Sequence, residues 1–337
     1  MKGSVCMKVV SKRVLAVLVI VALSLTIIGC AGAEEGADSG EKTYKIAMVA
    51  NASIADGGWN SACYDGMIGA AELNGWETSY SENVEQTDYV ATFTEYGNLG
   101  YDLVFAPGNE FSDAVKEAAA SYPDTNFIVL NGEVVEENVE SIMADNTMIG
   151  FLAGTLAGLK TQTNEVALIG GMEITPAMQS IDGFEQGVAY VNPDANVSVA
   201  FTNSWSDAAK GKEAALSLID TKDCDVFFGI SSAGDAGMRE ALADYDDRWT
   251  IAQPSDLLDQ FPDITLTSIM NDNAQLIGNS MKAVMNGEFG NKVFLGGLTE
   301  NVLAIGEFGE SANDVKDEYM EIVEGIRDGS ITFDYNV

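Results

Sequence analysis

From Tyr44 onward, short apolar runs alternate with amphipathic stretches along the chain. The runs KIAMVAN, DLVFAP and EVALIG are examples. Runs of this kind predict parallel strands that are buried on both faces, and the stretches between them predict helices. The predicted strands are 45–51, 76–81, 102–107, 126–131, 140–144, 165–170, 196–201, 226–230 and 249–252, and the predicted helices are 59–74, 88–99, 111–122, 148–160, 177–191, 208–220 and 236–245.

This series divides into two sets, which indicates two α/β lobes of similar design. Right-handed crossovers between parallel strands produce doubly wound sheets, so we expect two Rossmann-like lobes. The predicted N-terminal lobe covers residues 44–146 plus about 255–292, and the C-terminal lobe covers 147–254 plus about 293–337. Ligands of open α/β sheets bind beyond the carboxyl ends of the strands. The loops at those ends are therefore the place to seek a site.

The first 29 residues have the pattern of a bacterial signal peptide. Residues 1–13 are basic, and the apolar run 14–28 is shorter than the ~20 residues that span a bilayer. The run ends in Ile-Ile-Gly-Cys, which resembles a lipobox, so we expect a palmitate-type lipid on Cys30. Residues 30–43 lack large apolar side chains and should form a flexible tether. An ordinary signal peptide or a short transmembrane anchor is the alternative.

Charge and composition exclude several classes of function. The 337 residues carry 52 Asp and Glu against 17 Lys and Arg, a net charge of −35. Removal of the signal takes four of the 17 bases and no acid, which leaves 13 bases and a net charge of −39. Such a surface repels phosphate backbones, which argues against nucleic acid as a partner. The absence of histidine excludes Ser-His-Asp catalysis and imidazole zinc sites, and no cofactor or metal is predicted.

The four cysteines also fit a lipoprotein. Cys6 leaves with the signal and Cys30 carries the lipid, so Cys63 and Cys224 remain. The predicted fold places these two in different lobes. We therefore expect two small buried thiols, with a disulfide as the alternative.

Polar and aromatic residues follow the strands of the first set. After the first strand, Trp59 opens a helix within the stretch 51–60. An exposed indole at this point can stack on a planar ligand, and an indole that anchors the helix in the core is the alternative. The candidate ligand-binding residues of this lobe are Asn51, Asp56, Trp59, Asn60, Asn109 and Asn131.

The second set repeats this arrangement. The stretches 170–173, 204–207 and 231–235 follow its first three strands. Trp205 could clamp a flat ring together with Trp59, while helix capping or turn formation is the alternative role of the polar residues. Acids at the cleft, such as Glu173, favour neutral or cationic solutes. The candidates of this lobe are Met172, Glu173, Trp205, Ser232 and Asp235.

Several motifs resemble the basic membrane protein family of substrate-binding lipoproteins. They are Gly-Gly-Met-Glu-Ile-Thr-Pro (170–176), Gly-Phe-Glu-Gln-Gly (183–187), Asn-Pro-Asp (192–194), Ser-Asp-Ala-Ala-Lys-Gly-Lys-Glu (206–213) and Gly-Thr-Leu-Ala-Gly (154–158). The resemblance covers about residues 44–308. It implies a type I periplasmic-binding-protein fold and the delivery of a small solute to an ABC importer. Family members of known ligand mostly bind purine nucleosides.

The resemblance also implies roles for single residues. Trp59 occupies the position of an aromatic that stacks on the base, Trp205 matches a second cleft aromatic, and Glu173 matches an acidic position. Two positions depart from the family pattern. Pro254 stands where an acid holds ribose hydroxyls, and Asn271, a further candidate, stands where a lysine follows Thr-Ser. Both departures weaken the expectation that the ligand is a nucleoside. They leave the expectation of a small solute in place.

The sequence thus predicts a non-enzymatic, lipid-anchored solute-binding protein on the extracytoplasmic side of the cell membrane, with an ABC permease as its partner. The alternative is a surface sensor or adhesion lipoprotein that kept the fold but recognises a protein. A third hypothesis is an enzyme that uses a pair of carboxylates. With 52 acids in the chain, the sequence does not single out such a pair.

Overall fold

The computed structural model describes residues 42–55 and 59–337. The predicted signal peptide, the lipidation site Cys30 and the candidate Asp56 lie outside the described residues. Among the residues that are described, no helix has both the length and the apolar character that crossing a bilayer requires.

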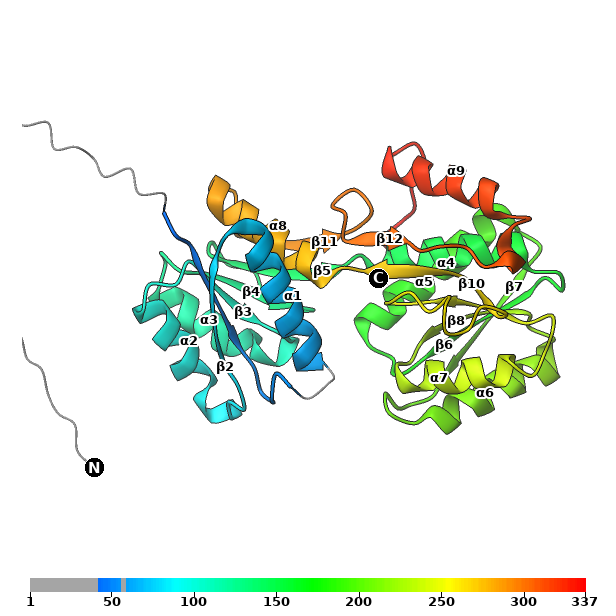
Figure 1. Ribbon diagram of the computed structural model, residues 1–337, viewed down its shortest axis with the longest axis horizontal. Coiled ribbons are helices and arrows are strands. Elements are labelled where there is room, and N and C mark those ends of the chain that lie inside the picture. The colour runs from blue at the N-terminus through cyan, green and yellow to red at the C-terminus, as the bar shows by residue number, and fades with distance from the viewer. Residues whose placement is uncertain (1–41, 56–58) are drawn as a thin grey trace, which may run out of the picture. The chain divides into compact units, whose positions relative to one another are not determined.

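Two six-stranded sheets organise the described part of the chain (Figure 1). Their strand orders are β11-β5-β4-β3-β1-β2 and β12-β10-β9-β8-β6-β7. The strands are β1 (Lys45–Val49), β2 (Glu77–Ser81), β3 (Leu103–Ala106), β4 (Asn126–Leu130), β5 (Val139–Ala144), β6 (Glu165–Gly170), β7 (Asn196–Phe201), β8 (Val226–Ile230), β9 (Trp249–Ala252), β10 (Thr265–Asn271), β11 (Lys292–Gly296) and β12 (Leu303–Ile305). The helices are α1 (Trp59–Asn74), α2 (Tyr89–Asn98), α3 (Ser112–Ser121), α4 (Asn146–Lys160), α5 (Thr175–Val191), α6 (Ala208–Lys222), α7 (Ala233–Leu242), α8 (Asn273–Asn286) and α9 (Lys316–Arg327).

The sheets confirm the predicted fold of two doubly wound lobes. The orders β2-β1-β3-β4-β5 and β7-β6-β8-β9-β10 are the same winding, and the strand pairs within them are parallel. β12 pairs antiparallel with β10 at one edge. The order reverses at β1 in the first lobe and at β6 in the second. Because a crevice forms at such a reversal, beyond the carboxyl ends of the strands, the loops after β1, β3, β6 and β8 are placed to line a site.

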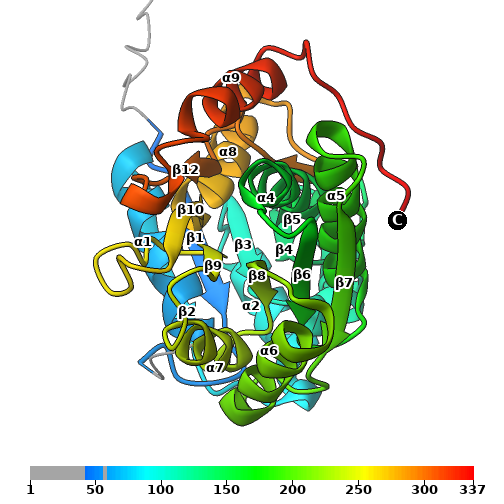
Figure 2. The same cartoon turned by 90° about the vertical axis from the view of Figure 1, so that its right-hand side faces the viewer.

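Helices cover both faces of each sheet, which explains the continuous apolar strands (Figure 2). In β1, Ala47 and Val49 pack with residues of α2 and α3, whereas Ile46 and Met48 pack with residues of α1. In the second lobe, α6 and α7 cover one face, and α4 and α5 cover the other. Alternate residues of one strand therefore meet different helices, and both sets must be apolar.

Three crossovers join the lobes in the part of the chain that the structure describes. β5 leads into α4 at Asp145, β10 leads into α8 at Asp272, and β11 leads into β12 through residues 297–302. The backbone N–H of Asp145 donates to the carbonyl of Gly296 (3.0 Å), and that of Asp272 donates to the carbonyl of Val302 (2.9 Å). The crossovers are therefore hydrogen-bonded to one another, as a joint between two lobes requires.

The lobe boundaries that the sequence predicts are wrong in the last third of the chain. β10 lies in the second sheet, although the sequence assigns 255–292 to the N-terminal lobe. β11 lies in the first sheet, although residues from about 293 were expected in the other lobe. The physical reason is that β10 buries polar side chains completely, namely Thr265, Thr267 and Ser268, so no apolar run reveals it.

Helices α4 and α5 pack with their backbones in contact. A Cβ atom at Gly154 would lie 2.1 Å from the carbonyl oxygen of Phe184. A Cβ atom at Gly183 would lie 2.0 Å from the carbonyl oxygen of Thr147. Both glycines belong to the glycine-containing motifs of the sequence, and the structure shows that these motifs serve helix packing.

The two remaining cysteines are fully buried in different lobes, Cys63 in α1 and Cys224 two residues before β8, and no disulfide joins them. This confirms the expected buried thiols. Burial raises the pKa of Cys224 to about 11. The Cys224 thiol is therefore protonated at neutral pH and is a poor nucleophile.

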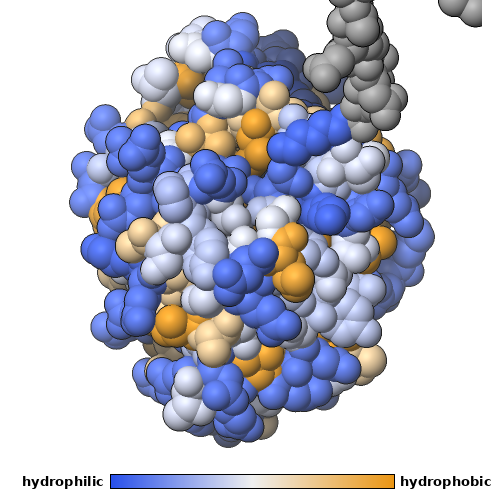
Figure 3. Space-filling view, turned by 90° about the vertical axis from the view of Figure 1, so that its left-hand side faces the viewer, coloured by the Kyte–Doolittle hydropathy of each residue, from blue (hydrophilic) through white to orange (hydrophobic). Residues whose placement is uncertain are grey.

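The outer face of the first lobe is mostly hydrophilic, with apolar side chains in small separate groups (Figure 3). Exposed apolar residues of this lobe include Leu73, Tyr80 and Leu99. Scattered apolar residues of this kind are normal on a soluble surface.

Candidate functional site

Trp59 lies at the carboxyl end of the first sheet, where it begins α1. Its indole N–H donates to the backbone carbonyl of Pro107, which follows β3 (2.5 Å). This bond ties the start of α1 to the loop after β3, next to the reversal of the sheet. The side chain is 48% exposed, which favours an accessible indole over one that anchors the core.

Asn51 connects several side chains beside Trp59. Its amide nitrogen donates to Glu110 Oε1 (2.9 Å), and its amide oxygen accepts from Asn60 Nδ2 (3.3 Å). Asn51 also hydrogen-bonds Tyr89, whose pKa is raised by burial and by the nearby carboxylates Glu110 and Glu85. The structure therefore brings the candidates Asn51, Trp59 and Asn60 together at one strand end.

Two carboxylates at this end of the lobe, Glu110 and Glu82, were not among the sequence candidates. Glu110 follows Asn109 in a short 3₁₀ helix, and its Oε2 lies 2.2 Å from the place that a Cβ atom of Gly108 would take. Glu82 Oε2 accepts from the backbone N–H of Ile54 (3.0 Å) and from a serine hydroxyl in the loop after β1. The sequence feature that could have indicated Glu110 is its position directly after the candidate Asn109.

Trp205 is the counterpart of Trp59 in the second lobe. It lies in the loop between β7 and α6, and its side chain is 43% exposed. A Cβ atom at Gly171 would lie 2.4 Å from two carbons of the indole ring, so the ring rests on the glycine backbone after β6. The carbonyl of Trp205 accepts from the N–H of Ala233, the first residue of α7. These contacts gather the loops after β6, β7 and β8 around one indole.

Met172 and Glu173 follow the glycine that supports Trp205, and both are exposed. The N–H of Gly171 donates to the carbonyl of Ile230 at the end of β8 (3.2 Å), which places this loop beside the reversal of the second sheet. Three sequence candidates, Met172, Glu173 and Trp205, thus share one strand end.

Asp235 is directed into the lobe and not toward the crevice. Its Oδ1 accepts from the backbone N–H of Ser231 (2.8 Å) and from the Ser231 hydroxyl (2.7 Å), and only 7% of Asp235 is exposed. Burial raises the pKa of Asp235, although the bonds from Ser231 and the nearby Arg239 oppose the shift. These contacts explain Asp235 as a group that fixes the start of α7, while Ser232 beside it is exposed.

We expect the Asp235→Asn variant to change how stability depends on pH. A carboxyl whose pKa is higher in the folded state stabilises the fold below its unfolded value near 3.8, and this contribution is lost as the pH rises through the folded pKa. The free energy of unfolding of the wild type should therefore fall relative to the variant as the pH rises above about 4. Urea unfolding at several pH values measures this difference, and a difference that stays constant with pH contradicts the prediction.

Two further candidates, Asn109 and Asn131, lie after β3 and β4. Asn109 Oδ1 accepts from the hydroxyl of Ser112 (2.9 Å), which is a local contact at the start of α3. Asn131 is exposed, has a left-handed backbone conformation (φ 56°) and donates its N–H to the carbonyl of Ile142. Both remain candidates, although the bond of Asn109 is local and that of Asn131 continues the pairing of β4 with β5.

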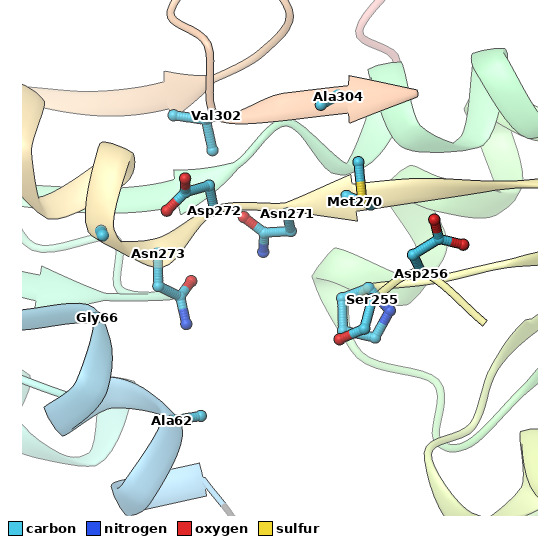
Figure 4. A pocket seen from close by; sticks show the side chains of 12 residues that line it. Ala62, Gly66, Ser255, Asp256, Met270, Asn271, Asp272, Asn273, Val302 and Ala304 are labelled. Carbon is cyan, nitrogen blue, oxygen red and sulfur yellow. The ribbon is translucent and has the colours of Figure 1, made fainter. Parts of the chain in front are cut away.

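A pocket of about 510 Å³ lies beside the crossovers (Figure 4). Residues of α1, of the loop after β9, of the end of β10, of the start of α8 and of β12 with the residue before it line the pocket. In Figure 4, Asn271 and Asn273 lie between Ala62 and Gly66 on one side and Ser255 on the other. The pocket therefore includes residues from both lobes. Its acidic lining residues are Asp256 and Asp272.

The two positions that depart from the family pattern both line this pocket. The backbone N–H of Asn271 donates to the carbonyl of Pro254 (2.9 Å). The side-chain oxygen of Asn271 is buried and has no hydrogen-bond partner among the described residues. Asp256 Oδ1 accepts from Ser268 Oγ (2.9 Å), which holds this carboxylate two residues beyond Pro254. A buried acceptor without a partner is costly, so Asn271 is suited to a donor from a bound molecule.

Comparisons with known proteins identify solute-binding proteins of ABC transporters as relatives of the chain. Residues 43–333 match the family model described as ABC transporter substrate-binding protein PnrA-like. A nucleoside-binding protein of an ABC transporter in Lactococcus lactis is 30% identical over 241 residues, which are 69% of each chain. A putative glucose-binding protein of an ABC transporter in Haloferax volcanii is 27% identical over 300 residues, which are 86% of this chain and 74% of the other.

Among solved structures, one described as a transcriptional activator of the comK gene from Bacillus halodurans has the same fold. It superposes with a TM-score of 0.73 at 23% identity, over 86% of this chain and 99% of the other. The family model covers nearly the whole described body, including both indoles and the crossover pocket. The chain belongs to the PnrA-like family of ABC transporter substrate-binding proteins.

Proposed function

We propose that the chain binds a small polar solute with a flat portion between Trp59 and Trp205 and hands it, chemically unchanged, to an ABC permease. The observation that carries the proposal is the pair of exposed indoles, one on each lobe, each held by backbone contacts at the carboxyl end of its sheet. As a member of its family, the chain is an extracytoplasmic substrate-binding protein of an ABC transporter.

A nucleoside-like solute fits this arrangement better than a simple sugar. The relative from Lactococcus lactis is named for nucleosides, and the relative from Haloferax volcanii is named for glucose. Stacking on an aromatic side chain is worth roughly 1–3 kcal/mol for a nucleobase. The pocket beside the crossovers, with the amides of Asn271 and Asn273, offers hydrogen bonds to the polar end of such a molecule.

Two-lobed binding proteins close around their ligand by a hinge motion, which is a signal that a permease can read. The hydrogen-bonded crossovers at Asp145 and Asp272 are the joint about which such a motion can occur. Closure buries the indoles against the solute, so bound solute should stabilise the fold.

Thermal-shift screening tests the proposal. The full chain is heated with single members of a panel of nucleosides, nucleobases, sugars and amino acids. We expect at least one member to raise the melting temperature in a concentration-dependent manner, because a ligand that binds only the folded state stabilises it. No response to any small solute would overturn the proposed function.

We further propose that a lipid on Cys30 anchors the chain to the cell membrane. The supporting observation is the basic stretch, short apolar run and Ile-Ile-Gly-Cys sequence that end at this residue. In cells fed with labelled palmitate, the wild-type chain should incorporate label and the Cys30→Ala variant should not. The Cys63→Ala variant is the matched control, and label that persists after Cys30→Ala contradicts the proposal.

A further inference from the structure

We propose that the solute carries a positive charge on its flat portion, and that Glu110 and Glu173, each beside an exposed indole, recognise this charge. The inference rests on the proposed function and names the class of solute for the same site. It follows from the pairing of a carboxylate with an indole in each lobe and from the absence of basic residues in the loops around them.

In the first lobe, Trp59 and Glu110 contact two adjacent backbone residues after β3. The indole donates to the carbonyl of Pro107, and the Glu110 carboxylate lies against Gly108. Asn51 holds Glu110 Oε1 at 2.9 Å, so the carboxylate is oriented while it remains exposed. An aromatic face and an oriented carboxylate are thus presented together.

The second lobe repeats this pairing through Gly171. The ring of Trp205 rests on Gly171, and Glu173 follows two residues later. Both side chains are exposed at the end of β6. A solute between the lobes would therefore meet an indole and a carboxylate from each side.

Basic side chains are missing from the loops that surround the crevice. The first basic residue after the loop 202–207 is Lys210, which lies within α6, three residues after Asp207. The crossover pocket likewise has two carboxylates and no Lys or Arg among its lining residues. The loops without any Lys or Arg are 50–58, 82–85, 107–108, 131–133, 171–174, 202–207, 231–232 and 253–257.

This arrangement favours a cation for two physical reasons. A cation over an indole face is attracted by about 0.5–2 kcal/mol, most strongly when water is excluded. A cleft lined by charges of one sign also focuses the field and raises the local concentration of the opposite charge. An anionic solute would meet repulsion from Glu110, Glu173, Asp256 and Asp272 with no base in the loops to offset it.

Two matched triples of small molecules test the charge. N1-methylnicotinamide, nicotinamide and nicotinate share one ring and are cationic, neutral and anionic. The molecules 1-methyladenosine, adenosine and adenosine 5′-monophosphate form a second triple with the same order of charge. Calorimetric titration of the full chain at low ionic strength should show that the cation of a triple binds about tenfold more tightly than its neutral member, and that the anion does not bind.

Substitution of Glu110 and Glu173 by glutamine distinguishes a role in binding the charge of the solute from a role in holding the structure of the site. The Glu110→Gln variant keeps an oxygen that can accept from Asn51, and we expect it to weaken binding of the cations about fivefold or more while the neutral members are unaffected. Glu173→Gln should act in the same direction. The matched control is Glu321→Gln, an exposed acid on α9, which should change neither. A merely structural role of Glu110 would weaken cation and neutral molecule alike.

The possible outcomes keep the two proposals distinguishable. A neutral or anionic member that binds as tightly as its cation overturns the inference about charge, while the proposed solute binding stands. The absence of binding by all six molecules also overturns it, and the thermal-shift panel then decides separately whether a solute is bound at all. Equal loss of cation and neutral binding in Glu110→Gln overturns the role of that residue.

Discussion

Replacement of Trp59 or Trp205 by alanine is expected to weaken solute binding by about ten- to a hundredfold. Stacking of a flat ring on an aromatic side chain contributes roughly 1–3 kcal/mol, and every 1.4 kcal/mol is a factor of about ten in affinity. Each indole is nearly half exposed in the free structure, so its loss leaves no cavity in the core. The solute identified by the thermal-shift panel serves as the ligand, and calorimetric titration provides the affinity.

A matched control separates this effect from a loss of folding. Leu73 is an apolar residue at the end of α1 with 71% of its side chain exposed, and Leu73→Ala should bind as the wild type does. Trp59→Ala should melt within a few degrees of the wild type in the absence of solute. Affinities of both tryptophan variants within about twofold of the wild type would show that the indoles do not hold the solute.

The Gly154→Ala variant should lower the free energy of unfolding by about 2–3 kcal/mol, because overpacking in a tight interface forces backbones apart. The added methyl carbon would lie 2.1 Å from the carbonyl oxygen of Phe184, and a backbone atom cannot rotate away as a flexible side chain can. α4 and α5 would have to separate by about 1 Å, with loss of contacts along both helices. Urea unfolding of the full chain measures the change.

Gly278→Ala provides the control for this prediction. Gly278 lies in α8, and a Cβ atom there would meet its nearest neighbour, Asn74 Nδ2, at 3.4 Å, which is an ordinary contact. Alanine in a helix interior is favoured over glycine by about 0.5–1 kcal/mol, so this variant should be as stable as the wild type or slightly more so. Equal effects of Gly154→Ala and Gly278→Ala would contradict the close packing of α4 and α5.

The fold could be predicted where burial coincides with apolar sequence. β6 and β8 read as unbroken apolar runs, and both were predicted with the bounds that the structure shows. β10 could not be recognised in the same way, since Thr267 and Ser268 are buried and satisfied by hydrogen bonds to residues far along the chain. Thr267 Oγ1 donates to the carbonyl of Gly306 (3.1 Å), and Ser268 Oγ donates to Asp256. Such partners are known only once the fold is known.

For the candidate site, the sequence predicts the positions of the residues but not the orientations of their side chains. The rule that ligands bind at strand ends located the loops, and it selected Trp59 and Trp205, which are exposed in the structure. The rule does not predict the orientation of a side chain. Asp235 has the same kind of position, yet its carboxylate is directed inward to Ser231. Glu110 was overlooked because its orientation depends on Asn51, a residue from a different strand end.

The positions of the acidic residues in the fold are more informative than the net charge of the whole chain. As a property of the whole sequence, a net charge of −35 argues only against nucleic acid and other anionic partners. At the strand ends, the same excess of acid becomes a property of the site, because Glu110 and Glu173 lie there and the surrounding loops contain no Lys or Arg. The salt dependence of binding by a cationic solute would reflect this, since added salt screens charges at exposed sites.

Native mass spectrometry of the full chain, as purified without added ligand, tests the central claim most directly. We expect a population with one small solute per chain, and we expect the Trp59→Ala, Trp205→Ala double variant to lose that solute while it remains folded. Recovery of the same solute at full occupancy in the folded double variant would contradict the account, because the solute would then be held elsewhere than between the two indoles.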